Sequence, residues 1–430
     1  MKLTEPTPAI RAKAILTSSL GGALENYDFT IYIFVAPILA LLFFPSDNSF
    51  VSLLNTLGVF AIGYFSRFLG AVLFGHYGDK RGRKKGMLIS IAIMALATIF
   101  IGFIPAYASI GILAPILLVS LRFLQGIAIG GDLSGAITFV AEYAEPKSRG
   151  LSCSFVYCAV NIGIVLASSI AALLTLLLTH EQFISWGWRI LFWLGSIIGV
   201  VGFYLRSRVA ETPFFTELAQ SKNIIKFPLF YLFRIHLKEL LQAMGLVWLW
   251  AVIIAQIFLF MPTYLHQISH LELDKILALN AINTLIFALC IPLMGYLSDK
   301  IGRKPLILTT AALFIILSYP LYTQLAYGSI GFKMLALCCF AILSAGIVGT
   351  VPCVLSELFP TQVRYSGVAI TYNAGFAIFA GLTPMIATYL LYEFHYPQVP
   401  SFNIILSAIG AFIVALTIKE TNQKILSGGT

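Results

Sequence analysis

Apolar residues in this 430-residue chain come in continuous blocks of about 20, separated by short polar clusters and prolines. A helix rises 1.5 Å per residue, so a block of this length crosses the roughly 30 Å hydrocarbon core of a bilayer. A water-soluble helix would instead show an apolar stripe on one face. The pattern therefore predicts an all-α membrane protein whose helices span the bilayer.

The blocks predict twelve transmembrane helices. The first contains Glu25 and Asp28 and is longer than the apolar region of a signal peptide, so we expect it to be retained as the first span. The blocks lie near residues 15–42, 52–75, 86–105, 112–141, 151–179, 188–205, 239–265, 276–298, 305–326, 333–356, 366–392 and 401–418.

Composition and charge fix the class and the orientation. Only 10% of the residues are charged, against roughly a quarter in soluble domains. The net charge of +9 does not indicate nucleic-acid binding, because all but five of the 27 Lys and Arg residues fall in alternate loops. Arg189, Lys275 and Lys333 lie on the opposite side, and Arg67 and Arg122 lie inside spans. The positive-inside rule then predicts that both termini are cytoplasmic.

The second half of the chain repeats the first. The segment Gly75 to Lys84, with Asp79, Gly82 and Arg83, recurs 220 residues later as Gly295 to Lys304, with Asp299, Gly302 and Arg303. Glu142 and Arg149 recur 215 residues later as Glu357 and Arg364. We expect an N-terminal six-helix bundle at 1–205, a cytoplasmic linker at 206–238 and a C-terminal six-helix bundle at 239–430. Parallel repeats of this kind are typical of transporters with a central site.

Two copies of Gly-x-x-x-Asp-Lys-x-Gly-Arg-Lys after matching spans resemble the signature of the major facilitator superfamily. The chain further resembles its metabolite:proton symporter branch, which holds proline/betaine, oxoglutarate, citrate and shikimate carriers. This resemblance covers essentially the whole chain. It is carried by Glu25–Phe29, Arg67–Ala71, Arg122–Asp132, Trp186–Ile190, Glu211–Pro213 and Glu357–Gly367. Phe68, Asp132 and Asn26 depart from the usual pattern of the branch.

The resemblance implies two six-helix bundles related by a pseudo-two-fold axis along the membrane normal, and transport by alternating access. It also implies a conformational gate that holds the cytoplasmic side closed. From the residues themselves, Gly75 and Gly295 permit close helix approach, and Asp79 and Asp299 can cap the amino terminus of a neighbouring helix. The predicted gate comprises Gly75, Asp79, Arg83, Glu142, Arg149, Gly295, Asp299, Arg303, Glu357 and Arg364.

Four ionisable residues fall near one plane inside the membrane: Glu25 and Asp28 on one face of the first span, Arg67 in the second and Arg122 in the fourth. Such charges are costly there and need partners. If Asp28 pairs with Arg122, separating them in a site of low dielectric constant favours proton uptake, which couples protons to conformation. The resemblance to sugar carriers implies this role for Asp28 and Arg122. Glu25 is the alternative proton site, and a permanent packing cluster is the alternative to coupling.

Arg67 is the candidate ligand for a substrate carboxylate, because guanidinium binds carboxylate through two hydrogen bonds. Its alternative role is bonding to backbone carbonyls. Trp248 and Trp250 could face a quaternary ammonium, but membrane tryptophans more often mark interfaces. Further candidate liners are Tyr32, Tyr157, Asn161, Gln256, Asn280, Asn283, Tyr372 and Asn373.

Other classes are less compatible with the sequence. The chain has no Gly-Lys dipeptide, which excludes an ATP-binding P-loop. The six cysteines have no metal-ligand spacing, and His266 with His270 is an incidental pair, so we expect no enzyme, metal or cofactor. We predict a monomeric bacterial inner-membrane symporter that couples protons to a small organic acid or zwitterionic osmolyte. An uncoupled facilitator or a non-transporting nutrient sensor of the same fold is the alternative.

Overall fold

The computed structural model describes residues 7–46, 49–221, 225, 227–269, 273–423 and 426. Lys222 and Lys226 of the predicted linker and His270 lie outside these residues.

The long helices divide between the two halves of the chain. The first half holds α1 (Pro8–Phe34) with α2 (Ala36–Phe43), α3 (Ser49–Arg81), α4 (Arg83–Phe103), α6 (Leu113–Tyr143), α7 (Arg149–Leu177) and α9 (Trp188–Ser207). The second half holds α12 (Leu237–Ile253), α14 (Leu273–Ile301), α15 (Arg303–Tyr327), α16 (Ile330–Val348) with α17 (Val351–Leu358), α18 (Arg364–Gly375) with α19 (Gly381–Phe394), and α20 (Val399–Thr417).

These helices form the two six-helix bundles of the predicted fold class. In the described part of the chain, ten helical segments are long and apolar enough to cross a membrane, and the bent pair α1 and α2 makes an eleventh. The 33-residue helix α3 supplies the remaining span and packs along α6. The first span differs from the expected single helix, because α1 and α2 meet at 61°. Pro37 has no N–H to continue the helix, which accounts for the break at Val35.

Three spans contain a π-helical turn with one extra residue per turn. These turns are η2 (Phe183–Gly187) before α9, η3 (Ile254–Leu259) after α12 and η4 (Phe376–Ala380) between α18 and α19. Such turns occur often at functional sites because they redirect the side chains on either side. Two of them, η3 and η4, directly follow the stretches of α12 and α18 that face the first half.

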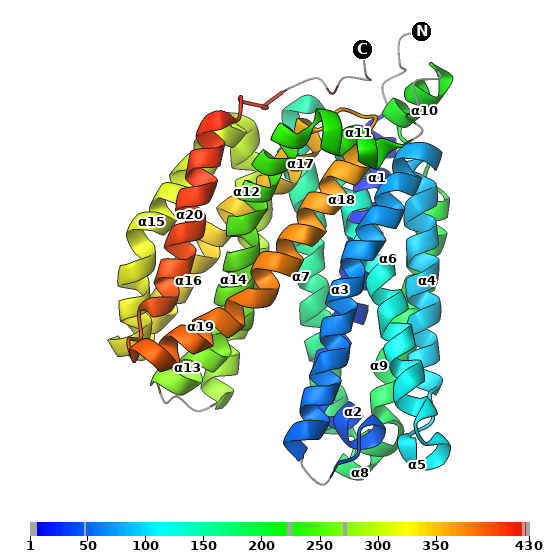
Figure 1. Cartoon of the computed structure of the whole chain (residues 1–430), viewed down its shortest axis with the longest axis vertical. Helices are drawn as coiled ribbons and strands as arrows, with labels where there is room; N and C mark the ends of the chain where they lie inside the picture. The colour runs from blue at the N-terminus through cyan, green and yellow to red at the C-terminus, as the bar shows by residue number, and fades with distance from the viewer. Residues whose placement is uncertain are drawn as a thin grey trace.

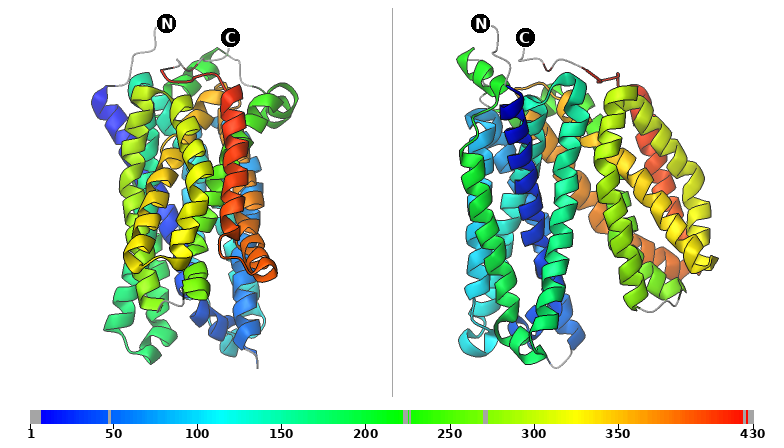
Figure 2. Two further views of the ribbon diagram at one scale, coloured as in Figure 1. Left: turned by 90° about the vertical axis from the view of Figure 1, so that its left-hand side faces the viewer. Right: turned by 180° about the vertical axis from the view of Figure 1, so that it is seen from behind.

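The two bundles converge at the end of the molecule where α1 begins and α20 ends, and they diverge toward the other end (Figure 1). We call the first of these ends the terminal face. Contacts between the halves join α3 to α18, α7 to α14, and α6 to α17 and α18. The view from behind shows the same convergence (Figure 2, right). The halves are therefore closed against each other at the terminal face.

The connector between the halves contains two short helices, α10 (Pro213–Gln220) and α11 (Pro228–Ile235), and both lie at the terminal face (Figure 1). Helix α10 packs on α6, and α11 packs on α3 and α12. The domain limits at 205 and 239 stay a prediction. The remaining short elements are α5 (Tyr107–Ile110), η1 (Pro146–Ser148), α8 (His180–Gln182) and α13 (Met261–Ser269).

Candidate functional site

Two aspartates at the terminal face each hold the first turn of a helix from the opposite half. Asp79, at the end of α3, accepts hydrogen bonds from the backbone N–H groups of Tyr365 (3.1 Å) and Ser366 (2.8 Å) in α18. Asp299, at the end of α14, accepts from the N–H groups of Gly150 (2.9 Å) and Leu151 (2.8 Å) in α7. A carboxylate at a helix amino terminus satisfies free N–H donors and interacts favourably with the helix dipole.

Both aspartates also pair with the arginine four residues later. Arg83 Nη2 lies 3.2 Å from Asp79 Oδ1, and Arg303 Nη1 lies 2.7 Å from Asp299 Oδ1. Arg83 reaches further across the interface and donates to the Thr361 carbonyl at 2.5 Å. The four side chains are buried, so each charge depends on these partners.

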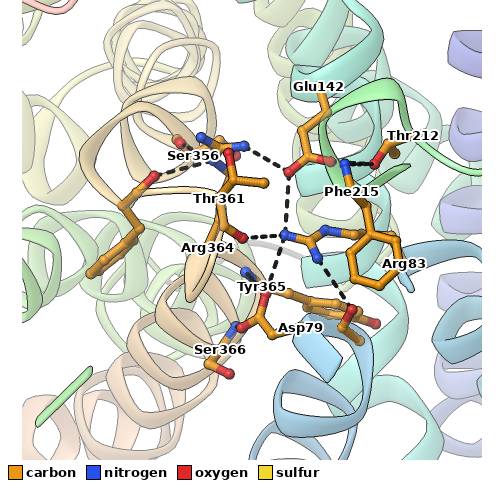
Figure 3. Close-up of polar contacts among 12 residues, drawn as sticks. Asp79, Arg83, Glu142, Thr212, Phe215, Ser356, Thr361, Arg364, Tyr365 and Ser366 are labelled. Atoms are coloured by element: carbon orange, nitrogen blue, oxygen red, sulfur yellow. Dashed lines mark hydrogen bonds and ion pairs between the residues drawn. The ribbon is translucent and has the colours of Figure 1, made fainter. Parts of the chain in front are cut away.

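The predicted Glu and Arg residues are brought together in crossed pairs between the halves. Arg364 Nη1 lies 2.7 Å from Glu142 Oε1, and Arg149 Nη1 lies 2.9 Å from Glu357 Oε1. Arg83 also approaches Glu142 at 3.4 Å, so Glu142 lies between two guanidinium groups from opposite halves (Figure 3). The repeated motifs of the sequence are therefore paired with one another across the interface.

At the two repeated glycines the backbones of the halves approach each other closely. A Cβ on Gly75 would lie 2.9 Å from Ser366 Cα, and one on Gly295 would lie 2.8 Å from the Gly150 carbonyl oxygen. Real Cβ atoms essentially never approach other atoms so closely. We call the ten predicted residues listed above the gate, since the structure unites all of them at the terminal face.

Tyr365, which was not among the predicted gate residues, also crosses the interface between the halves. This fully buried side chain of α18 inserts between α3, α4 and α6 of the other half, and its hydroxyl donates to the Gly131 carbonyl at 2.7 Å. Gly78 and Gly135 leave the space that its ring occupies, since a Cβ on either would collide with it.

A second missed feature is a pair of Glu-Thr dipeptides that completes the gate on both sides. Thr212 donates to Glu142 Oε2 at 2.5 Å, and Thr421 donates to Glu357 Oε2 at 2.6 Å. Glu211 accepts from the Lys84 N–H at the start of α4, and Glu420 accepts from the Arg303 and Lys304 N–H groups at the start of α15. Burial raises the pKa of the Glu211 carboxyl, and the N–H groups of Thr212 and Lys84 oppose that shift. The signal was present in the sequence, because Glu-Thr recurs 209 residues apart.

Inside the first bundle, Asp28 and Arg122 lie at the two ends of a hydrogen-bonded chain. Thr98 Oγ1 donates to Asp28 Oδ2 (3.1 Å) and accepts from Gln125 Nε2 (2.7 Å), and Arg122 Nη1 donates to Gln125 Oε1 (2.9 Å). The expected direct ion pair is thus replaced, within the described residues, by a link through Thr98 and Gln125. The physical reason is that α4 contributes a hydroxyl between the carboxylate of α1 and the guanidinium of α6. Arg122 also lies over the ring of Tyr32, 4.2 Å from its centroid.

Glu25 belongs to a different group of charges. It lies with Asp28 and Asp132 around a small cavity between α1, α4, α6 and α9. Asp132 is ion-paired with Arg206, whose side chain is only 4% exposed. The sequence placed Arg206 in a solvated linker, but the structure buries it at the end of α9, where it approaches α1 beside Gly21.

Arg67 lies at the junction of the halves beside a group of aromatic rings. Its guanidinium carbon is 5.9 Å from the centroid of Tyr372 in α18 and 5.6 Å from that of Phe29 in α1. The Tyr372 ring lies 5.2 Å from Trp250 of α12, and Tyr157 of α7 lies 4.8 Å from Trp250. We call Tyr157, Trp250, Tyr372 and Phe376 the aromatic cluster. It is built from both halves, so any movement of one half against the other changes its shape.

The other predicted liners are distributed around the molecule. Asn161 donates to the Tyr157 carbonyl at 2.8 Å and stays near the aromatic cluster, and Asn373 donates across the interface to the Gly130 carbonyl at 3.0 Å. Tyr32 donates to the Thr56 carbonyl, and Gln256 donates to Tyr322, each within its own half. Asn280 donates to the Phe258 carbonyl, and Asn283 is fully buried in α14.

Comparisons with known proteins agree with this geometry. Residues 14–226 match the family model "Sugar (and other) transporter", and residues 274–428 match "Major Facilitator Superfamily". The chain is 36% identical to the glycine betaine/proline/ectoine/pipecolic acid transporter OusA of Dickeya dadantii (strain 3937), over 97% of this chain and 85% of that protein. It is 34% identical to the proline/betaine transporter of Escherichia coli (strain K12), with the same coverage.

Solved structures show the same fold. The proton:xylose symporter XylE bound to 6-bromo-6-deoxy-D-glucose superposes with a TM-score of 0.81, at 19% identity, over 97% of this chain and 98% of that chain. A partially occluded inward open conformation of XylE from E. coli gives a TM-score of 0.69, also at 19% identity, over 97% of this chain and all of that chain.

The chain is an integral membrane transporter of the alternating-access class. It has two helical bundles, a polar and aromatic cluster at their junction, and a set of contacts that closes one face. The chain belongs to the major facilitator superfamily. The relatives are transporters by name, so neither an enzyme nor a non-transporting sensor is favoured.

Proposed function

We propose that the chain is a proton-coupled symporter for zwitterionic osmolytes, that is, small solutes with a carboxylate and a secondary or quaternary ammonium group. The observation that carries this proposal is the position of Arg67 next to the aromatic cluster at the junction of the halves. Guanidinium is a good ligand for a carboxylate, and the faces of Trp and Tyr attract a cationic nitrogen group.

The named relatives support the same substrate class. OusA is a transporter of glycine betaine, proline, ectoine and pipecolic acid, and the E. coli relative is a proline/betaine transporter. Each of these solutes carries one carboxylate and one cationic nitrogen group. The sequence alone left organic acids and osmolytes open, and a single Arg67 beside a large aromatic surface favours the osmolytes over citrate or oxoglutarate.

Coupling to protons is assigned to Asp28. Asp28 is 2% exposed, lies in the last third of α1, and is linked through Thr98 and Gln125 to Arg122. Arg122 stabilises the ionised form of Asp28 while this link is intact. If alternation moves Arg122 away, the carboxylate lies in a site of low dielectric constant and takes a proton. One proton then accompanies each cycle.

We assign the terminal face to the cytoplasm, in a bacterial inner membrane. The positive-inside rule supports this orientation, since most Lys and Arg residues belong to segments that meet at this face. The gate then closes the cytoplasmic side, and the arrangement of the halves corresponds to a state that accepts substrate from outside. Opening the gate while the other ends approach releases the substrate inside.

The test is uptake into proteoliposomes of labelled glycine betaine, proline, oxoglutarate and citrate, with and without an imposed inward proton gradient. We expect glycine betaine and proline to accumulate above the external concentration only with the gradient, and the two acids to remain at background. Accumulation that is independent of the gradient would contradict coupling. Preferential uptake of citrate or oxoglutarate would contradict the assigned substrate class. Arg67→Lys, which keeps the positive charge but loses the two-pronged geometry, should weaken uptake of both glycine betaine and proline.

A further inference from the structure

The buried cavity of the first bundle lies apart from the aromatic cluster and is lined by three carboxyl groups. Glu25 and Asp28 come from α1 and Asp132 from α6, and the remaining walls are mainly apolar or glycine, from α4, α6 and α9. Its volume of about 20 Å³ is enough for a single water molecule. The site therefore combines acidic groups with room for one mobile proton carrier.

Each of the three carboxyl groups has at least one oxygen that receives no hydrogen bond. In the described part of the chain this holds for both oxygens of Glu25, for Asp28 Oδ1 and for Asp132 Oδ2. The three side chains are at most 5% exposed. An ionised carboxylate without a donor is costly in such a place, so these oxygens need either a proton or a water molecule. Glu25 in particular has no role in the contacts described above.

Asp132 differs from the other two because it has a fixed cation. Arg206 Nη1 is ion-paired with Asp132 Oδ1, Ser90 donates to the same oxygen at 3.1 Å, and Arg206 Nη2 donates to the Ser18 carbonyl at 3.3 Å. A Cβ on Gly21 would collide with the Arg206 guanidinium, so this glycine makes room for the pair. The charged groups that act on Glu25 are Asp132, Arg67 and Arg206.

These groups lie in order along one side of α1. Ser18, Gly21, Glu25 and Asp28 are spaced by three or four residues, so they share one helical face that extends about 15 Å. Of these groups, Asp28 lies farthest from the terminal face, and Ser18 and Arg206 lie nearest to it. The acidic groups thus form a line from the proposed coupling site toward the end of the bundle where the gate is closed.

We propose that the proton carried by Asp28 leaves through the first bundle, by way of the cavity, Glu25 and Asp132, rather than through the space between the halves. Each step moves one proton: the O–H bond of the donor carboxyl breaks, a new O–H bond forms on the water or the next carboxylate, and the donor is left ionised. The last acceptor is solvent at the terminal face. Asp132, ion-paired with Arg206, is the last carboxyl group on this route before the terminal face. This route rests on the proposed proton coupling, and it keeps the proton apart from the substrate.

The experiment uses the full chain in proteoliposomes and compares two activities. Exchange of labelled for unlabelled glycine betaine requires substrate movement without net proton transfer, whereas accumulation driven by a pH gradient requires the proton to be released. For Glu25→Gln and Asp132→Asn we expect the ratio of accumulation to exchange to fall at least tenfold. Glu393→Gln, which removes an exposed carboxylate of α19, is the matched control and should leave the ratio unchanged.

Three further outcomes separate the possible failures. Glu25→Asp keeps a carboxyl group in the cavity and should retain more of the ratio than Glu25→Gln, which tests the route even if Glu25→Gln folds poorly. If Glu25→Gln and Asp132→Asn both accumulate substrate to the wild-type level, the proposed route is wrong and proton coupling still stands. Absence of gradient-driven accumulation in the wild type would overturn the coupling proposal itself, and the route with it.

Discussion

At the scale of single residues, the polar groups of the membrane interior are arranged as short chains rather than as isolated pairs. Asp28 reaches Arg122 through Thr98 and Gln125, and Glu25 faces Asp132, which is paired with Arg206. Thr98 and Gln125 are uncharged and lie between the two opposite charges. A small displacement can therefore break the hydrogen-bonded link without pulling apart a direct ion pair inside the membrane. That property suits a site that must alternate between two protonation states.

Thr98 is the residue whose hydroxyl makes the link between α1 and α6. Thr98→Val keeps the shape but removes the hydroxyl, so Asp28 loses a donor worth about 1.5–3 kcal/mol for a charged acceptor. We expect accumulation driven by a pH gradient to fall roughly tenfold, with a smaller effect on exchange. Thr388→Val is the control, because the Thr388 hydroxyl is exposed and bonds only to its own helix at the Pro384 carbonyl. Equal accumulation in Thr98→Val and wild type would show that the link has no part in coupling.

Trp250 is the residue that should decide recognition of the ammonium group. Its ring lies 4.8 Å from Tyr157 and 5.2 Å from Tyr372, at the junction of the halves. A cation–π contact contributes about 0.5–2 kcal/mol, so Trp250→Leu should raise the KM for glycine betaine by about 2- to 30-fold. Trp248→Leu on the same helix is the control, since Trp248 stacks on Phe379 instead. The assignment is wrong if the two substitutions raise the KM equally.

At the scale of elements, the gate is made of helix ends. Helices α3 and α14 each end on an aspartate that caps the first turn of a helix from the other half, α18 and α7 respectively. A glycine one turn earlier lets the backbones approach. The gate therefore needs both the charge of the aspartate and the lack of a side chain at the glycine. This explains why the glycine and the aspartate recur together in both repeats.

Gly295 tests the requirement for close approach. A Cβ there would meet Ser154 and the backbone of Gly150, and overpacking of this kind costs about 1–3 kcal/mol. We expect Gly295→Ala to favour opening of the terminal face and so to expose Cys153 of α7 and Cys353 of α17, which are both fully buried in the closed arrangement. The measurement is the rate of maleimide labelling in a background with the other four cysteines replaced by alanine.

The control for Gly295→Ala is Gly331→Ala, because nothing lies within 4 Å of a Cβ at that position. We expect the labelling rate to rise several-fold to about a hundredfold in Gly295→Ala and to stay unchanged in Gly331→Ala. An unchanged rate in both variants would mean that close approach at Gly295 does not hold the face shut.

At the scale of the whole molecule, the sequence was sufficient to predict the two-bundle fold, because twelve apolar blocks and two repeated loops can be recognised from the residue types alone. The sequence was not sufficient to predict contacts made by residues that have no recognisable motif or spacing. Thr98 and Gln125 have no distinguishing spacing, and Arg206 sits at a helix end where a basic residue is normally solvated. Its burial depends on Gly21 and Asp132, which belong to other helices. The break at Val35 was also not expected, although Pro37 lies next to it.

The pseudo-symmetric halves lead to a prediction about how the gate opens. Asp79 and Asp299 make equivalent contacts at two places on one face, and both contacts join the same two bundles. If each bundle moves as a unit, both contacts break in one step, and their free energies add within a single opening equilibrium. Asp79→Asn and Asp299→Asn each remove a charge–dipole interaction of about 0.3–2 kcal/mol, and with it the ion pair to Arg83 or Arg303. Each should therefore raise the labelling rate of Cys153 and Cys353 by a factor, and the double variant should show the product of the two factors. If the double variant labels no faster than the faster single variant, the two contacts open separately, and the bundles do not move as rigid units.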